Sequence, residues 1–236
     1  MIEEILPVTV KSFDTFTDPA GVILFPEEAA LVRRVAVKRR AEFTTARDCA
    51  HRAMRRLGLD PVPILSGSYG EPLWPPGVIG SITHCAGYRA AAVSAEPGAV
   101  GIDAEPDAPL PPGVLEVVSV PGERDMLRRL AERHPRTSWD RLLFSAKESV
   151  YKAWFPLAGR WLDFQDAVVS VDPLRGTFRA ELLVPGPRWM GRPLTGFSGR
   201  WRTGGGLIVT AVAAIAAAHT VPPAVPPARG HESTLR

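Results

Sequence analysis

The segment Phe144-Ser-Ala-Lys147-Glu148-Ser-Val-Tyr-Lys152-Ala-Trp154 places a carboxylate and an ammonium group four residues apart within an otherwise apolar stretch. Four residues make about one helical turn, so Glu148 and Lys152 are predicted to lie on one face of a helix. Apolar residues recur around Glu148 at helical intervals, which places its carboxylate beside the buried stripe. A carboxylate in that position needs a compensating partner.

Two further carboxylates lie upstream, in Gly101-Ile-Asp103-Ala-Glu105-Pro106. Side chains two residues apart on a strand point to the same side, so Asp103 and Glu105 are predicted to face one way where a strand ends. Two such carboxylates repel each other unless a cation lies between them. The candidate ligands are all oxygens, which favours magnesium. With Glu148 and Lys152, these acids suggest a magnesium–phosphate site.

Both groups also have an ordinary interpretation. Asp103 and Glu105 could be solvated acids on an edge strand, as most Asp-x-Glu pairs are. Glu148 and Lys152 could form a simple salt bridge within one helix, which contributes only about 0.3–0.5 kcal/mol. The aromatic residues around Glu148 argue against a fully solvated face.

The composition fits one sizeable domain or two small ones, because 45% of the 236 residues are hydrophobic and 22% are charged. The net charge of +3 suits an anionic ligand or an acidic protein partner. Two cysteines are too few for a disulfide scaffold, and no leader opens the chain, so we expect a cytoplasmic protein. The longest apolar run, residues 207–218, is too short to span a membrane and is predicted to be a buried strand, although its alanine-rich end could be helical.

The order of elements predicts an α+β fold built from two pseudo-symmetric α/β halves with antiparallel strands. The expected units are residues 1–108, residues 109–220 and a Pro-rich tail, 221–236. Residues 1–25 are predicted to be strand and loop, with an alternating stretch at residues 5–10 and a short apolar run at residues 21–25. Residues 61–76 are predicted to be an ordered loop. Helices are expected from residue 26, from about residue 36 or 38 to 57, and near 121–133 and 138–155. Strands are expected at about 78–84, 89–94, 99–104, 167–171, 177–183, 194–201 and 207–215.

Positively charged residues and one histidine are candidates for binding phosphate. Arg39, Arg40 and Arg47 could form an ordinary basic helix face, or could hold separated phosphates about two turns apart. His84, at the end of an apolar strand, could be a hydrogen-bonded structural residue or a phosphate donor. It is not expected to act as a base for Cys85, because adjacent strand residues point to opposite faces.

These motifs together resemble a known family. The matching segments are Lys38-Arg39-Arg40-Ala-Glu42-Phe43 with Arg47, Gly70-Glu71-Pro72-Leu-Trp74-Pro75, Gly80-Ser-Ile-Thr-His84-Cys-Ala-Gly-Tyr88, Gly101-Ile-Asp103-Ala-Glu105 and the segment 144–154. In order and spacing they resemble the larger, monomeric 4′-phosphopantetheinyl transferases of polyketide, nonribosomal peptide and siderophore assembly lines. The similarity extends over most of residues 30–215 and favours the branch that resembles enterobactin-synthetase component D.

The resemblance implies transfer of phosphopantetheine from coenzyme A to a serine of an acyl or peptidyl carrier protein, with release of 3′,5′-ADP. By analogy, Asp103, Glu105 and Glu148 would hold Mg²⁺, Glu148 would also take the serine proton, and Lys152 would steady the pyrophosphate. The implied coenzyme A contacts are Arg39, Arg47, Gly70, Glu71, Pro72, Thr83 and His84. The implied fold has two similar halves with the active site in the cleft between them.

The resemblance also sets expectations for partners and leaves alternatives open. Carrier proteins of polyketide, nonribosomal peptide or fatty acid synthases are the implied partners, and residues 126–133 are a candidate docking surface. Residues 65–69 lack the lysines that the family often has there, so arginines or backbone amides would substitute, or coenzyme A would bind more weakly. A magnesium-dependent phosphohydrolase of coenzyme A or a nucleotide is the alternative enzyme. A nucleic-acid-binding module is disfavoured, because unneutralised acids repel phosphate.

Overall fold

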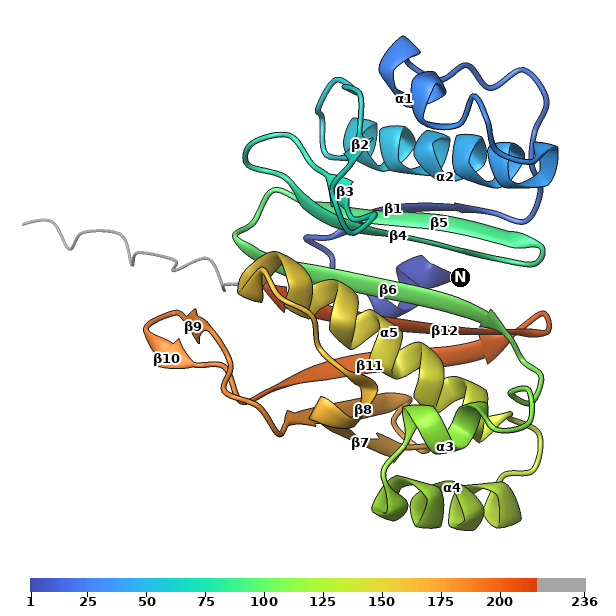
Figure 1. The fold of residues 1–236 in the computed structure, drawn as a ribbon, viewed down its shortest axis with the longest axis vertical. Helices are drawn as coiled ribbons and strands as arrows, with labels where there is room; N and C mark the ends of the chain where they lie inside the picture. The colour runs from blue at the N-terminus through green and yellow to red at the C-terminus, as the bar shows by residue number, and fades with distance from the viewer. Residues whose placement is uncertain (216–236) are drawn as a thin grey trace, which may run out of the picture.

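Two antiparallel sheets stacked face to face, each covered on its outer side by a long helix, make up the protein. The computed structural model describes residues 1–215. The layers follow the order α2 (Val37–Arg56), a three-stranded sheet, a five-stranded sheet and α5 (Trp139–Ala158), as Figure 1 shows. The α+β prediction is therefore confirmed. None of the helices within these residues is long and apolar enough to cross a membrane.

The first sheet has the strand order β1-β5-β4. Its strands are β1 (Lys11–Thr15), β4 (Ile79–Cys85) and β5 (Tyr88–Ser94). β5 is buried along its whole length, since α2 packs on one side of it and the second sheet on the other. The other elements of this part are a 3-10 turn (Ile2–Ile5), α1 (Pro26–Leu31), β2 (Leu65–Ser66) and β3 (Pro72–Leu73).

The second sheet has the strand order β6-β12-β11-β8-β7. Its strands are β6 (Gly98–Pro106), β7 (Ala167–Asp172), β8 (Thr177–Leu182), β11 (Gly196–Gly204) and β12 (Leu207–Ile215). The remaining elements are α3 (Val114–Val118), α4 (Pro121–Arg133), a 3-10 turn (Phe164–Asp166), β9 (Arg188–Trp189) and β10 (Arg192–Pro193).

Strand β6 joins the two sheets and carries Asp103 and Glu105. On one edge it pairs with β12 over its whole length. On the other edge, two hydroxyls of β4 satisfy its backbone, because Ser81 accepts from the Ile102 N–H and Thr83 accepts from the Ala104 N–H, each at 3.1 Å. The edge of β6 is thereby protected from pairing with another chain.

Helix α5 lies directly on β6 because the strand has a glycine at the crossing point. A Cβ on Gly101 would lie 1.9 Å from the Ser149 carbonyl oxygen and 2.7 Å from the Ala153 nitrogen. Only a residue without a Cβ fits against the helix backbone at this distance. The helix residues Glu148 and Lys152 are thus held close to the strand residue Asp103.

The structure agrees with most of the predicted elements and corrects others. The predicted helices and the strands from residue 78 onwards are present. The alternating stretch of residues 5–10 is wrong as a strand: Ile5 ends a 3-10 turn, Val8 is 84% exposed, and the strand begins at Lys11. The apolar run before Pro26 is coil, and α3 was not predicted.

The division of the chain into units stays a prediction. β6 belongs by sequence to the predicted unit 1–108 but pairs with β12 in the second sheet. The end of the unit 109–220 and the tail 221–236 lie outside the described residues, as does the alanine-rich end of the run 207–218.

Candidate active site

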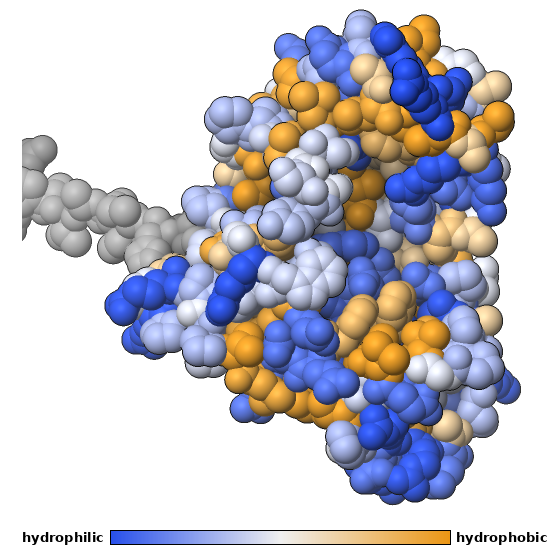
Figure 2. All heavy atoms as spheres, viewed as in Figure 1, coloured by the Kyte–Doolittle hydropathy of each residue, from blue (hydrophilic) through white to orange (hydrophobic). Residues whose placement is uncertain are grey.

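A cleft of about 570 Å³ lies between the β2–β3 hairpin and helix α5. Gly70, Glu71 and Pro72 line it from the hairpin, while Glu148 and Lys152 line it from the helix. Figure 2 shows the surface hollowed between the two layers, with hydrophilic residues along the hollow. Gly80, Ser81 and Ile82 of β4 also line it, so residues from three of the predicted motifs face one cavity.

Asp103 and Lys152 form an ion pair across this junction. The Lys152 ammonium donates to Asp103 Oδ1 at 2.7 Å, and the Thr83 hydroxyl donates to the same oxygen at 3.1 Å. Within the described residues Lys152 pairs with Asp103 rather than with Glu148, so the simple salt bridge within α5 is wrong. The other oxygen, Asp103 Oδ2, is buried without a hydrogen-bond partner among those residues.

Thr83 serves Asp103, although the sequence resemblance placed it among the coenzyme A contacts. Its side chain is buried between the sheets, where it donates to Asp103 and accepts from the Ala104 N–H. Neighbouring strand residues face opposite ways, so Thr83 and His84 lie on opposite faces of β4, and the contact of Thr83 with coenzyme A stays a prediction.

Glu105 is held by Arg141, a residue that the sequence reasoning missed. Arg141 Nη1 donates to Glu105 Oε2 at 2.9 Å, and both side chains are largely buried. Burial and the neighbouring charge of Asp103 raise the pKa of Glu105 above its usual value, and Arg141 opposes this shift. Arg141 precedes Glu148 by seven residues, or two helical turns, which is the sequence signal that could have identified it.

Glu148 lies half-buried on α5, beside this pair of acids. Burial and the charge of Asp103 raise its pKa, while Lys152 acts in the opposite direction. A carboxylate whose pKa is raised toward neutrality holds a proton more readily, which is what a general base requires. The prediction that Glu148 lies beside the buried stripe rather than on a solvated face is confirmed.

The donor set at this site is suited to a hard divalent cation. Asp103, Glu105 and Glu148 offer only carboxylate oxygens, which Mg²⁺ prefers, and the buried Asp103 Oδ2 has no partner among the described residues. Within residues 1–215, however, no three His, Cys, Asp or Glu side chains already converge as a ligand cluster. The chemistry of the donors therefore fits a metal, while the side chains are held by Lys152 and Arg141.

The basic residues predicted to bind phosphate fall into two environments. Arg39 is half-exposed, and its Nη1 contacts His84 Nε2. Burial and the charge of Arg39 lower the pKa of His84. Arg47 is buried and donates to the Ile64 carbonyl at 2.8 Å and to the Ser66 hydroxyl at 3.3 Å. Arg47 therefore supports the lysine-free stretch that leads to the hairpin.

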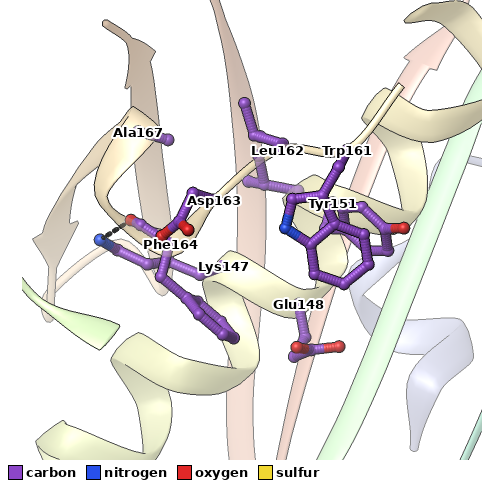
Figure 3. Close-up of a pocket in the computed structure, with 9 residues that line it drawn as sticks. Lys147, Glu148, Tyr151, Trp161, Leu162, Asp163, Phe164 and Ala167 are labelled. Carbon is purple, nitrogen blue, oxygen red and sulfur yellow. Dashed lines mark hydrogen bonds between the residues drawn. The ribbon is translucent and has the colours of Figure 1, made fainter. Parts of the chain in front are cut away.

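A second, narrow pocket of about 80 Å³ opens beside Glu148. Tyr151 and Trp161 flank it with ring centroids 4.6 Å apart, and Leu162 and Phe164 add apolar surface. In Figure 3 the Lys147 ammonium points away from Glu148 toward the Phe164 carbonyl, to which it donates at 2.6 Å. Trp161 and its neighbours were not predicted, because no motif marks them.

Lys147 also forms a fully buried ion pair with Glu123 of α4, at 2.8 Å. Glu123 accepts in addition from the Val169 N–H at 2.7 Å and the Val120 N–H at 2.8 Å. This pair fastens α4 and β7 to α5 behind the narrow pocket. It explains the position of Lys147, which the sequence left without a role.

Comparison with known proteins identifies two matching family models. Residues 27–94 match the 4′-phosphopantetheinyl transferase N-terminal domain, and residues 99–190 match the 4′-phosphopantetheinyl transferase superfamily. The two matches meet between β5 and β6. Together they contain every residue that the cleft brings together.

Relatives extend the similarity over almost the whole chain. The chain is 56% identical over 225 residues to the 4′-phosphopantetheinyl transferase Svp of Streptomyces mobaraensis, covering 93% of this chain and 92% of the relative. It is 46% identical to the 4′-phosphopantetheinyl transferase PptT of Mycobacterium tuberculosis, covering 90% and 97%. Enterobactin synthase component D of Escherichia coli is 34% identical over 150 residues, covering 58% and 66%.

Proposed function

Because the chain belongs to the 4′-phosphopantetheinyl transferase superfamily, we propose that its cleft between hairpin and α5 is where phosphopantetheine leaves coenzyme A for a carrier-protein serine. The chain is an enzyme of this class, and 3′,5′-ADP is its second product. One observation carries the assignment of the site: Gly70, Glu71 and Pro72 share a single cavity with Glu148 and Lys152. Nothing in the relatives' names favours the phosphohydrolase alternative.

Coenzyme A would lie across the two halves. The hairpin residues Gly70, Glu71 and Pro72 would line the adenine site, and Arg39 with His84 would hold the 3′-phosphate. The Arg39–His84 contact supports this, because it brings the two side chains together where one phosphate could accept from both. Arg47 would act mainly by holding residues 64–66 in place.

The pantetheine arm would enter the narrow pocket beside Glu148. Its walls of Tyr151, Trp161 and Leu162 are mainly apolar, and its small volume suits a slender chain. This arrangement would place the pyrophosphate between Lys152 and the acids. The position of Glu148 on the lining of both pockets supports it.

In the transfer step, Glu148 would take the proton from the carrier serine hydroxyl, directly or through water. The serine oxygen would bond to the phosphorus that carries pantetheine, and the bond from that phosphorus to the bridging oxygen would break. The electron pair would leave with 3′,5′-ADP. Lys152, which Asp103 holds in place, would donate to the departing phosphate.

Asp103, Glu105 and Glu148 would hold Mg²⁺. A bound Mg²⁺ would neutralise pyrophosphate charge that otherwise repels the serine oxygen. The partnerless Asp103 Oδ2 and the all-oxygen donor set support these ligands. Lys152 and Thr83 bind the other Asp103 oxygen and so leave Oδ2 available.

The proposal extends to the partner proteins, the oligomeric state and the location of the enzyme. The substrates would be carrier proteins of polyketide, nonribosomal peptide or fatty acid synthases, and the enzyme would act as a cytoplasmic monomer. The basic excess of the chain supports an acidic carrier, since opposite charges speed encounter. Exposed arginines on α4, including Arg128, Arg129 and Arg133, supply positive charge in the candidate docking surface 126–133.

Intact-protein mass spectrometry tests the function. An apo carrier is incubated with this protein, coenzyme A and Mg²⁺, and parallel samples contain EDTA or the Asp103→Ala variant. The expected result is a gain of one phosphopantetheinyl group that both controls abolish. Hydrolysis of coenzyme A without modification of several carrier types would instead establish the phosphohydrolase.

A further inference from the structure

Arg141 uses its whole guanidinium group to bind the segment that follows the metal-site acids. Besides Glu105, it contacts two backbone carbonyls, those of Ala108 and Pro109, each at 3.0 Å through Nε and Nη2. The three bonds together use the planar fork of donors that distinguishes arginine from lysine. Three bonds through three different nitrogens fix the orientation of the guanidinium group.

The same segment has further anchors at the start of α5. Asp140 Oδ2 accepts from the Leu110 N–H at 2.8 Å, and Asp107 Oδ1 accepts from the Ser138 N–H at 2.8 Å. The segment therefore stays attached to the helix when one bond is removed. Among these contacts within the described residues, the one from Arg141 to Glu105 is the one that reaches a proposed metal ligand. Loss of this contact can therefore be distinguished from loosening of the segment.

Within the described residues, Oε2 of Glu105 accepts a hydrogen bond and Oε1 does not. Arg141 binds Oε2 at 2.9 Å, which fixes the direction in which the carboxylate points. Glu105 is the second-last paired residue of β6, opposite Ile208, and backbone pairing alone does not fix the direction of its carboxylate. Asp103 is arranged in a parallel way, with Oδ1 bound to Lys152 and Oδ2 without a partner within residues 1–215.

We propose that Arg141 is a positioning residue that holds Glu105 in the orientation needed to bind the divalent cation, and that it acts through Glu105 alone. The inference depends on the metal site in the proposed function. Groups that orient a metal ligand typically change metal affinity by about 10- to 100-fold when they are removed. Arg141 does not line the coenzyme A cleft, so coenzyme A affinity is expected to stay unchanged.

The test measures binding of Mn²⁺ by electron paramagnetic resonance, with saturating coenzyme A and no carrier. Arg141→Met is expected to raise the Mn²⁺ Kd at least about tenfold. Arg141→Lys keeps the charge but loses the fork, and is expected to fall between Arg141→Met and the wild type. Asp140→Asn is the matched control, because it weakens the same segment without touching Glu105, and its Mn²⁺ Kd is expected to stay within twofold of wild type.

A double variant decides whether Arg141 acts through Glu105. In the Glu105→Gln background, Arg141→Met is expected to change the Mn²⁺ Kd by less than about twofold, because the ligand it positions is already lost. A full tenfold effect in that background would overturn the proposal. So would an unchanged Kd in Arg141→Met, an equal loss in Asp140→Asn, or a wild-type protein that binds no Mn²⁺.

The carrier assay is independent of this measurement. Absence of phosphopantetheinyl transfer would refute the proposed function even if Mn²⁺ binding depended on Arg141. Conversely, normal transfer with unchanged Mn²⁺ binding in Arg141→Met would refute only the role of Arg141. Thermal unfolding of each variant shows whether the folded population is comparable.

Discussion

Replacing Gly101 by alanine should damage both stability and catalysis, because this glycine sets the distance between β6 and α5. The new Cβ would lie 1.9 Å from the Ser149 carbonyl oxygen and 2.7 Å from the Ala153 nitrogen. Both are backbone atoms, so no change of rotamer relieves the clash. Carbon–oxygen contacts are normally about 3.3–3.6 Å, so the helix and strand must separate by more than about 1 Å.

The size of the effect follows from this displacement. Overpacking a well-filled core typically costs about 1–3 kcal/mol. In a protein of this size each kcal/mol lowers the Tm by about 2–4 °C, so a fall of roughly 2–12 °C is expected. Glu148 and Lys152 would move away from Asp103 by the same distance, and a misplacement of about 1 Å can reduce the rate about 100-fold.

Thermal unfolding and the carrier assay measure the two effects separately. Gly122→Ala is the matched control, because Gly122 lies in the first turn of α4 with no atom near the added Cβ. That substitution should leave activity unchanged and stabilise the helix by up to about 1 kcal/mol. If Gly101→Ala kept the wild-type Tm and kcat, the direct contact between α5 and β6 would be refuted.

Three further predictions test other parts of the site. Glu148→Gln should abolish transfer, because the variant lacks the proposed base and metal ligand. Coenzyme A binding, measured by calorimetry, should stay largely intact, because the substitution removes little contact area. Normal turnover would exclude Glu148 as an essential base. Lys147→Met should lower stability by about 3–5 kcal/mol in chemical unfolding, because it leaves the Glu123 carboxylate buried without its charge partner; an unchanged midpoint, or no recovery in the double variant with Glu123→Gln, would contradict this. Burial and the charge of Arg39 lower the pKa of His84 in the free protein, and binding of a 3′-phosphate should raise that pKa and take up a proton. The affinity for 3′,5′-ADP should therefore fall as the pH rises from the pKa of His84 in the free protein to its higher pKa in the complex, and His84→Gln should lose this dependence.

Local sequence patterns predicted the helices and strands whose formation depends mainly on their own residues. The helix from Val37 and the helix around Glu148 both follow from periodicity and caps, and the late strands follow from short apolar runs. β1 was missed because its sequence, Lys-Ser-Phe-Asp-Thr, is polar, and it is a strand only through pairing with β5. The apolar alternation before it led to the wrong assignment of residues 5–10.

The acids were predictable, but their partners were not. Asp103, Glu105 and Glu148 stand in recognisable motifs, whereas Arg141 meets Glu105 across 36 residues and Lys152 meets Asp103 across 49. Such pairs depend on how α5 crosses β6, which no local pattern determines.

The pairing of β6 with β12 has a consequence for the timing of synthesis. Gly98 lies opposite Ile215, so the strand that bears Asp103 and Glu105 leaves the ribosome long before its hydrogen-bonding partner does. Until β12 emerges, the nascent chain holds two adjacent carboxylates on a strand with an unpaired edge. The five-stranded sheet cannot be completed before β12 emerges, and a pause in translation before residue 207 would prolong exposure of that edge to other nascent chains.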